Sequence, residues 1–222
     1  MTKSEFQITI KEAHKMVDAL MPCISTEETR YYLCGIHIEN DSRAGMMAVA
    51  TNGHHMGTLR INPMQDDSKT PDLSVPEFNF ILPMEAVKWI DKLPRKFNYD
   101  PLLRFESDGV KVKLSAIPLG MVFECKLIDG SFPDWRRVMP TEYSVSASFN
   151  AGYMKDIASA IKKAGSKRMS LLEISIVDSR GPAVITTNDT ALHYVILPMG
   201  SDDAIKHTNA YVPSPAPETA TA

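Results

Sequence analysis

The sequence lacks the features that mark disulfide-bonded, zinc-binding and membrane-spanning proteins. Its three cysteines, Cys23, Cys34 and Cys125, are unclustered and show no Cys-x-x-Cys spacing. An odd, scattered set fits a reduced cytosolic protein better than a disulfide framework. No apolar run approaches the roughly 18 residues that span a bilayer. The first residues also lack the uninterrupted apolar stretch of a signal peptide, so we expect a cytoplasmic location.

Motifs of catalysis are missing as well. The sequence has no glycine-rich phosphate loop and no Gly-x-Ser-x-Gly elbow. His54 and His55, with His37 or Cys34, suggest a metal site at first sight. Adjacent histidines on a strand point to opposite faces, however, and no His-x-x-x-His spacing supports them. We therefore expect no enzymatic activity, no bound metal and no cofactor.

What is present is an internal repeat with a period near 70 residues, whose units begin at about residues 6, 78 and 145. Each unit opens with a strand-like run, at 6–10, 78–82 and 145–149. Each continues with an amphipathic helix and then with alternating runs typical of strands. With 222 residues and 44% apolar content, the chain can bury a core in one large or two small domains.

Capping signals delimit the three predicted helices. The first has a capping box, Thr9 with Glu12; the second begins at Pro83 and stops at Pro94; the third is capped by Asn150 and closed by Gly165. Their apolar residues recur at helical spacing: Ala13, Met16, Val17 and Leu20; Ala86, Trp89, Ile90 and Leu93; Met154, Ile157, Ala158 and Ile161.

The predicted strands follow each helix. They lie at 31–39 and 46–52, at 102–106, 110–114 and 121–128, and at 174–178, 183–188 and 193–199. Residues 62–77 read as a linker, and the tail at 201–222 reads as disordered. The pattern predicts an α+β fold of repeated strand–helix–strand units, with helices on one face of antiparallel sheets.

The net charge of −3 gives no global sign of nucleic-acid binding, but the predicted helices are locally basic. A single basic helix is usually a solvated face, whereas three of them favour a surface that follows phosphates without reading bases. We therefore predict that a set of cationic side chains faces double-stranded DNA, independently of base sequence: Lys11, Lys15, Lys88, Lys92, Arg95, Lys96, Lys155, Lys162, Lys163, Lys167 and Arg168. His14 falls on the same polar face of the first helix.

Three segments together resemble a known family. They are RYYLCGIHIE at 30–39, VATNGHHMG at 49–57 and LIDGSFPDWRRVMP at 127–140. In that order and at similar spacing they resemble the central domain of the bacterial sliding clamp, the beta subunit of DNA polymerase III. Residues 6–140 are covered well. Residues 145–199 resemble, more faintly, the second half of the family's last domain.

The resemblance implies the DNA-clamp fold, with a clamp domain at 1–140 made of half-units 6–61 and 78–140, and a single half-unit at 141–200. It also implies a processivity factor that encircles duplex DNA and binds the replicative polymerase and the clamp loader through short linear peptides. Carried over by position, the apolar peptide pocket on the outer surface would contain Leu33, Thr51, Gly53, His54, His55, Met56, Pro133, Arg137, Val138, Val195, Leu197, Pro198 and Met199.

The chain departs from the family pattern in several respects. It resembles no part of the family's first domain, Asn52 replaces the usual Asp, and His55 and Met56 replace Arg-Leu. The family ring has twelve half-units and this chain three, which predicts a homo-oligomeric ring of four chains. A dimer and a trimer are the alternatives. The rival hypothesis is a shortened, clamp-like regulator of phage or plasmid type, which binds replication proteins without closing a ring.

Overall fold

A computed structural model places a large part of the chain in two separate compact units, Met1–Asp134 and Trp135–Ala222, which we call the N-terminal and C-terminal units. The described residues are 3–41, 45–64, 75–138, 147–164, 172–176, 178–187 and 193–199. The tail predicted to be disordered and Gly165 lie outside them. No helix in these ranges is long and apolar enough to cross a membrane.

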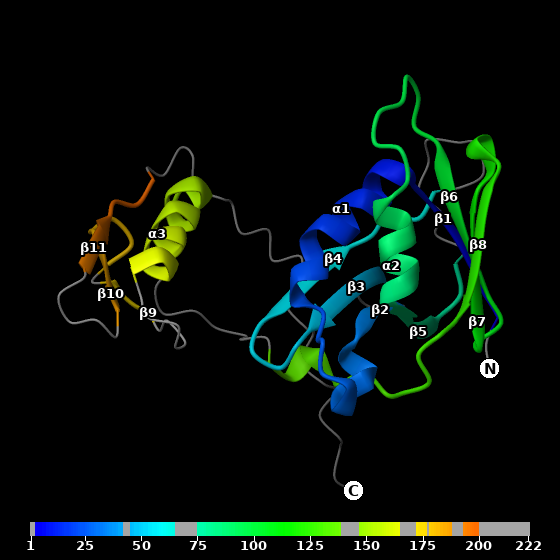
Figure 1. The fold of residues 1–222 in the computed structure, drawn as a ribbon, viewed down its shortest axis with the longest axis horizontal. Helices are drawn as coiled ribbons and strands as arrows, with labels where there is room; N and C mark the ends of the chain where they lie inside the picture. The colour runs from blue at the N-terminus through cyan, green and yellow to red at the C-terminus, as the bar shows by residue number, and fades with distance from the viewer. Residues whose placement is uncertain are drawn as a thin grey trace, which may run out of the picture. The chain divides into compact units, whose positions relative to one another are not determined.

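The N-terminal unit contains two consecutive half-units of the same design (Figure 1). The first runs through β1 (Ser4–Thr9), α1 (Ile10–Leu20), β2 (Gly35–Asp41), β3 (Gly45–Thr51) and β4 (Met56–Arg60). The second runs through β5 (Phe78–Pro83), α2 (Met84–Asp91), β6 (Leu102–Ser107), β7 (Lys111–Ala116) and β8 (Met121–Lys126). Short 3-10 turns lie at Met21–Cys23, Glu28–Leu33 and Ile117–Leu119.

The two half-units exchange their opening strands. One antiparallel sheet has the order β1-β6-β7-β8, and the other has the order β4-β3-β2-β5. In register, Phe6 lies opposite Phe105, and Phe80 lies opposite Ile38. Each half-unit therefore completes the sheet of the other.

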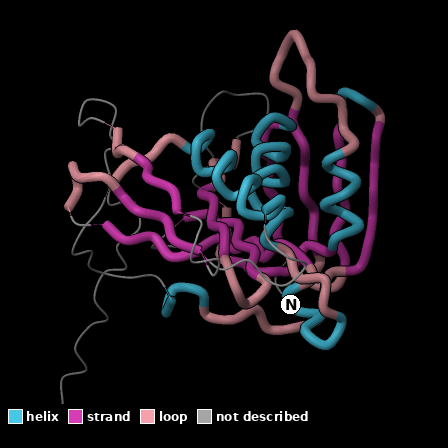
Figure 2. Tube along the Cα trace, turned by 60° about the vertical axis from the view of Figure 1, so that its left-hand side comes forward, coloured by secondary structure: helices cyan, strands magenta, loops and turns pink. Residues whose placement is uncertain are grey.

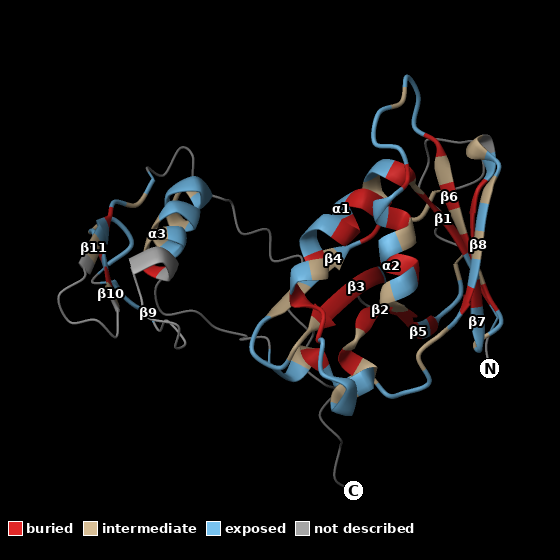
Figure 3. Ribbon diagram, viewed as in Figure 1, coloured by how far each residue is buried: buried red, intermediate tan, exposed pale blue. Residues whose placement is uncertain are grey.

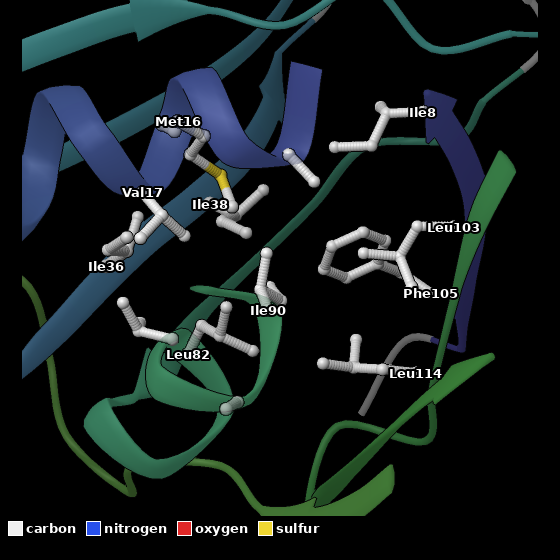
Figure 4. Packing of buried hydrophobic residues seen from close by; sticks show 14 of the residues in the cluster. Ile8, Met16, Val17, Ile36, Ile38, Leu82, Ile90, Leu103, Phe105 and Leu114 are labelled. Atoms are coloured by element: carbon white, nitrogen blue, oxygen red, sulfur yellow. The ribbon is translucent and has the colours of Figure 1, made fainter. Parts of the chain in front are cut away.

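Helices α1 and α2 pack against each other and against the sheets. Figure 2 shows the helices and strands of the chain from a second direction. The buried sides of the elements face one core (Figure 3). In Figure 4, apolar side chains from both helices and both sheets meet there, among them Met16, Ile38, Ile90, Phe105 and Leu114. This arrangement confirms the predicted α+β class with antiparallel sheets.

The C-terminal unit is a single half-unit. It contains a 3-10 turn (Trp135–Val138), α3 (Ala151–Ala164), and a sheet of order β11-β10-β9 formed by β9 (Leu172–Ile176), β10 (Ala183–Thr187) and β11 (His193–Ile196). Its small core joins Ile161 of α3 to Ala183, Ile185 and Ile196 of the sheet.

The helix signals in the sequence were mostly correct. The Thr9 hydroxyl accepts the Glu12 N–H at 3.1 Å, but the Glu12 carboxylate accepts the Asn62 N–H at 3.1 Å instead of closing the capping box. The Asn150 side chain caps α3 by accepting the Gly152 N–H at 2.7 Å. Pro83 ends β5 and caps α2 instead of being its first helical residue, and α2 already ends at Asp91.

Three strand predictions differ from the structure. Residues 31–33 belong to a 3-10 turn, so the strand predicted from residue 31 begins only at Gly35. Strand β4 was not predicted, because its five residues, MGTLR, show no clear alternation. The described part of the third opening run, 147–149, forms no strand.

Candidate functional site

The first and third family-like segments contact each other through two glycines. A Cβ atom on Gly130 would lie 2.9 Å from Cβ of Tyr32 and 3.3 Å from Cε2 of Tyr31. A Cβ atom on Gly35 would lie 3.0 Å from Cδ1 of Ile128 and would overlap the carbonyl oxygen of Leu82. Both positions therefore require glycine because backbone and aromatic groups approach closely. The resemblance supplied these segments, but sequence periodicity did not indicate that they touch.

An aromatic pair strengthens the same contact. The Phe132 ring stacks on the His37 imidazole, with ring centroids 4.6 Å apart and planes inclined by 6°. His37 Nε2 lies 2.9 Å from Oε2 of Glu39. The imidazole is therefore held by Phe132 on its ring face and by Glu39 at one ring nitrogen. His37 therefore anchors the loop that carries Phe132 on the sheet. Within the described ranges, no three His, Cys, Asp or Glu side chains gather in a way that suits a metal ion.

The second family-like segment forms the turn between β3 and β4. The Asn52 amide oxygen accepts the N–H groups of His54 and His55 at 3.0 and 3.2 Å. The Thr51 hydroxyl donates to the His55 carbonyl at 2.8 Å and accepts the Gly53 N–H at 3.1 Å. Gly53 has a left-handed φ of 87°, which favours glycine. Hydrogen bonds from the side chains of Thr51 and Asn52 thus hold the backbone of the turn.

This turn also contacts its surroundings. The His55 Nε2 atom lies 3.1 Å from the Pro22 carbonyl oxygen. The Gly53 backbone lies directly against the Arg30 guanidinium, so a Cβ atom there would require the end of the Arg30 side chain to move. Arg30 itself pairs with Glu27 at 2.7 Å. The first and second family-like segments therefore meet here, as the first and third do at Gly130.

The predicted pocket residues of the N-terminal unit differ in exposure. Leu33 is buried, so its side chain belongs to the interior. Gly53, His54, His55 and Pro133 are exposed, and Thr51 and Met56 are half-buried. The structure thus gathers Thr51, Gly53, His54, His55 and Met56 in one turn, whereas Leu33 offers little surface there.

The predicted pocket residues of the C-terminal unit are exposed apolar side chains. Val138, Val195 and Leu197 are 70%, 64% and 71% exposed, so they are not the core residues that hydrophobicity alone would suggest. Met199 is 41% exposed, Pro198 is half-buried and Arg137 is exposed. Val195 lies opposite Val184, which is exposed, while the neighbouring Ile185 and Ile196 are buried. Val184 and Val195 therefore lie on the sheet face opposite α3. The two halves of the predicted pocket fall in different units, so the complete pocket stays a prediction.

The helix face of the N-terminal unit carries exposed cations. Lys11 and Lys15 of α1 are exposed, as are Lys88 of α2 and Lys92 just after it. Arg95 and Lys96 follow α2 and are exposed too. His14 is an exception to the predicted polar face, because it is buried with Nε2 3.3 Å from the Pro94 carbonyl oxygen. It therefore joins α1 to the segment after α2.

Arg95 differs from the lysines because carboxylates already hold it. Its guanidinium binds Asp18 with two contacts, at 2.8 and 3.0 Å, and Asp91 at 2.6 Å. The hydrogen bond from Arg95 lowers the pKa of Asp18. The two carboxylates raise the pKa of Arg95 further above its already high value. Arg95 thus ties α1 to the end of α2, and its charge is compensated locally.

Acid should loosen this bridge. The pKa of Asp18 is depressed in the folded state, so its contribution to stability is complete above the unfolded pKa of about 3.9 and is lost as pH falls through the folded value. We expect Asp18→Asn to lower the melting temperature at neutral pH, and we expect this deficit to shrink as the pH falls below the unfolded pKa of about 3.9. Thermal melts across that range measure it. A deficit that stays constant with pH would contradict the ion-pair account.

The basic residues of the third helix are described only in part. Lys155 of α3 is exposed. The side chains of Lys162 and Lys163 lie outside what the structure describes, as do Lys167 and Arg168 entirely. Most members of the predicted DNA-facing set whose side chains the structure describes therefore lie on α1, on α2 and in the segment that follows α2.

Comparison with known proteins places this fold in context. Residues 7–134 match the family model described as the DNA polymerase III beta subunit, central domain. The beta sliding clamp of Caulobacter vibrioides is 31% identical over 149 residues, which cover 63% of this chain and 35% of that protein. The chain therefore spans little more than a third of this relative's length.

Solved structures show the same fold. A Caulobacter crescentus beta sliding clamp superposes with a TM-score of 0.70 at 21% identity, covering 87% of this chain and 50% of that one. A sliding clamp from Bartonella birtlesii bound to griselimycin gives a TM-score of 0.59 at 22% identity, covering 89% and 66%. At these identities the likeness concerns the fold.

Proposed function

The chain belongs to the DNA polymerase III beta-subunit family, and from this premise we propose that it is a sliding clamp. Assembled chains would encircle duplex DNA, in the cytoplasm at the nucleoid, and hold replication proteins on it. The observation that carries the proposal is the family match over 7–134, within which two helices of one unit present lysines together. Such a tether acts by topology, so it requires no catalytic group.

DNA would lie along the lysines of α1 and α2. The side chains of Lys11 and Lys15 on α1, of Lys88 on α2 and of Lys92 just after α2 are exposed, and the two helices pack against each other. Exposed ammonium groups on a helix surface suit contact with phosphates and not with base edges. Because Arg95 is held by Asp18 and Asp91, we assign it to positioning the helices and leave DNA contact to the lysines. A net acidic chain with a basic helix face favours sliding over tight binding.

Partner proteins would bind through exposed residues in each unit taken by itself. We assign the docking of apolar peptides, such as those of the replicative polymerase and the clamp loader, to two surfaces. In the N-terminal unit the surface is the β3–β4 turn with Pro133. In the C-terminal unit it comprises Arg137, Val138, Val195, Leu197, Pro198 and Met199. The support is the exposure of apolar side chains on the sheet face away from α3. Exposed Leu and Met next to proline are suitable anchors for a short peptide.

We choose griselimycin as the probe of the proposed pocket, since a sliding clamp of the same fold, from Bartonella birtlesii, was solved bound to it. We expect Leu197→Ala combined with Met199→Ala to weaken its binding about 30-fold or more, because the loss of even one anchor residue costs about 2 kcal/mol or more. Isothermal titration calorimetry on the full chain measures the change. Val184→Ala is the matched control, because Val184 lies on the same sheet face but outside the predicted pocket. Equal affinity of the double variant and the control would place the pocket elsewhere.

A closed ring would need several chains. Three half-units per chain suggest four chains, which light scattering would register as four times 24.6 kDa. A stable monomer at micromolar concentration would contradict ring formation and favour the clamp-like regulator instead. That rival would keep the outer pocket but leave the basic helices without a function.

A further inference from the structure

The C-terminal unit keeps a backbone contact found in both halves of the N-terminal unit. In each half-unit, one backbone hydrogen bond joins the opening segment to the end of the half-unit. The acceptor is the carbonyl oxygen of the residue three positions before the helix, and the donor is a backbone N–H just after the last strand. The pairs are Gln7 O with Met64 N at 2.8 Å, Ile81 O with Ile128 N at 3.1 Å, and Ser148 O with Met199 N at 2.8 Å. Segment 147–149 is therefore held in the place that β1 and β5 occupy in their own half-units.

In the N-terminal unit this place matters because the opening strand pairs with the other half-unit. β1 lies beside β6, and β5 lies beside β2. The inward-facing residues oppose one another directly: Ile8 faces Leu103, and Leu82 faces Ile36. An opening strand therefore adds to the first sheet strand of a second half-unit, not to its own sheet.

The C-terminal unit contains an opening segment and a first sheet strand, but the two are not paired with such partners in the described part of the chain. Among the residues that the structure describes, β9 pairs only with β10, and segment 147–149 lies in no sheet. All five residues of β9 are exposed, including Leu172, Ile174 and Ile176 at 45%, 40% and 37%. Ile174 and Ile176 nevertheless lie opposite the buried Ile185 and Ala183, so they face the helix side of the sheet. Such an apolar edge is a template for another strand.

Helix α3 also lacks a packing partner for part of its apolar side within the described part of the chain. Met154 and Ile157 are only half-buried, and Ala158 is exposed. The residues at the same distances from the start of α1 are Ala13, Met16 and Val17, each of which is at most 1% exposed. α1 differs in that a second helix, α2, packs beside it. The apolar side of α3, formed by Met154, Ile157 and Ala158, is therefore suited to packing against a second helix.

We propose that two copies of the chain join through their C-terminal units by exchanging segment 147–149, so that each adds a strand to β9 of the other. Two half-units related by a two-fold axis would form a complete domain like the N-terminal unit, with two four-stranded sheets and paired α3 helices. A second copy fits because it fills both strand positions and both helix faces at once. The inference rests on the proposed clamp function for its role in assembly, although the contact itself needs no DNA.

The register of the exchanged strands follows from the alternation of faces together with the pairing of β1 and β6. In β1 and β5 the residues two and four positions before the helix face the core; the corresponding residues here are Phe149 and Ala147. Phe149 packs on the C-terminal core. Residues directly opposite in an antiparallel pair share a face. Alternation alone leaves registers that differ by two residues, and the pairing of β1 with β6 selects one of them. Phe6, four positions before α1, lies opposite Phe105, two residues before the end of β6. By the same rule Ala147 of one copy lies opposite Ile174 of the other, and Phe149 lies opposite Leu172.

Cysteine pairs test this register on the full chain without DNA. The first variant carries both Ala147→Cys and Ile174→Cys. In the proposed dimer, the thiol at position 147 of one copy and the thiol at position 174 of the other would lie directly opposite, with Cβ atoms about 4.5–5.5 Å apart. That separation is close enough for a disulfide after slight adjustment. Mild oxidation should give a covalent dimer on a non-reducing gel. The matched control, Ala147→Cys with Glu173→Cys, places the second thiol on the other sheet face and should remain monomeric on the gel. Equal crosslinking of both variants, or none in either, would overturn the exchange.

A charge on β9 tests the interface independently. Ile174→Lys should halve the mass of the assembly measured by light scattering, because the lysine would lie between the sheet and the paired helices. Ser175→Lys adds the same charge on the opposite face of the same strand and should leave the mass unchanged. Equal masses for the two variants, or a monomeric wild-type chain, would refute the proposal. A crosslinked dimer that fails to stay on DNA would instead refute the clamp function alone.

Discussion

Replacing Lys88 and Lys92 by glutamate is expected to weaken DNA association more than tenfold and to make it less dependent on salt. Both ammonium groups are exposed on the α2 side, and neither pairs with a carboxylate in the described part of the chain. Each phosphate contact contributes about 0.9 to the slope of log affinity against log salt, so two lost contacts should reduce it by about two per chain. Fluorescence anisotropy of a labelled duplex across a salt series measures both quantities.

The control for this variant must carry the same charge change elsewhere. Lys113→Glu with Lys126→Glu places the charges on exposed positions of β7 and β8, on the sheet face away from the core. We expect this control to bind DNA within a few-fold of wild type, since only long-range repulsion changes. Arg95 stays unaltered in both variants because its loss would separate α1 from the end of α2. Equal losses in the two variants would mean that DNA contacts another surface.

Gly35→Ala is expected to destabilise the N-terminal unit by about 3 kcal/mol or more, through overpacking at a strand junction. The added Cβ would overlap the Leu82 carbonyl oxygen, and Ile128 Cδ1 would lie 3.0 Å away. A backbone carbonyl cannot rotate aside as a side chain can. The change would therefore push β2 from β5, the strand that the second half-unit contributes to this sheet. Urea unfolding followed by circular dichroism measures the loss.

Gly120→Ala provides the comparison for this substitution. Gly120 has a φ of 61°, but nothing lies within 4 Å of a Cβ atom there. Alanine at that site costs only the left-handed backbone penalty, about 1–2 kcal/mol. We expect the loss of stability to be clearly larger for Gly35→Ala. A smaller loss at position 35 would mean that the close approach of β2 and β5 relaxes easily.

Local patterns in the sequence predicted the helices well. The spacing of Ala13, Met16, Val17 and Leu20 predicts a buried face, and all four are buried. The Thr9 cap is present for the same reason, since it depends on residues only three positions apart. Such features are decided within one turn of helix, which a sequence displays directly.

Features that join distant residues could not be predicted in this way. The exchange of β1 and β5 between half-units is a choice of strand partner, and each strand has the same alternation with either partner. The stacking of Phe132 on His37 joins a loop to a strand nearly a hundred positions earlier. Arg95 looked like a DNA contact from its helical spacing, yet Asp18, 77 positions away, compensates its charge. Sequence spacing alone carries no information about such partners.

The most direct test of the clamp account is the retention of the full chain on DNA of different topology. The assembly would be formed on nicked circular plasmid, passed over a large-pore gel-filtration column at high salt, and measured again after the plasmid is cut once. A closed ring predicts that protein stays with circular DNA despite screened charges and leaves once the DNA has ends. Equal retention on circular and linear DNA, or release from both, would contradict the central claim that the chain encircles DNA.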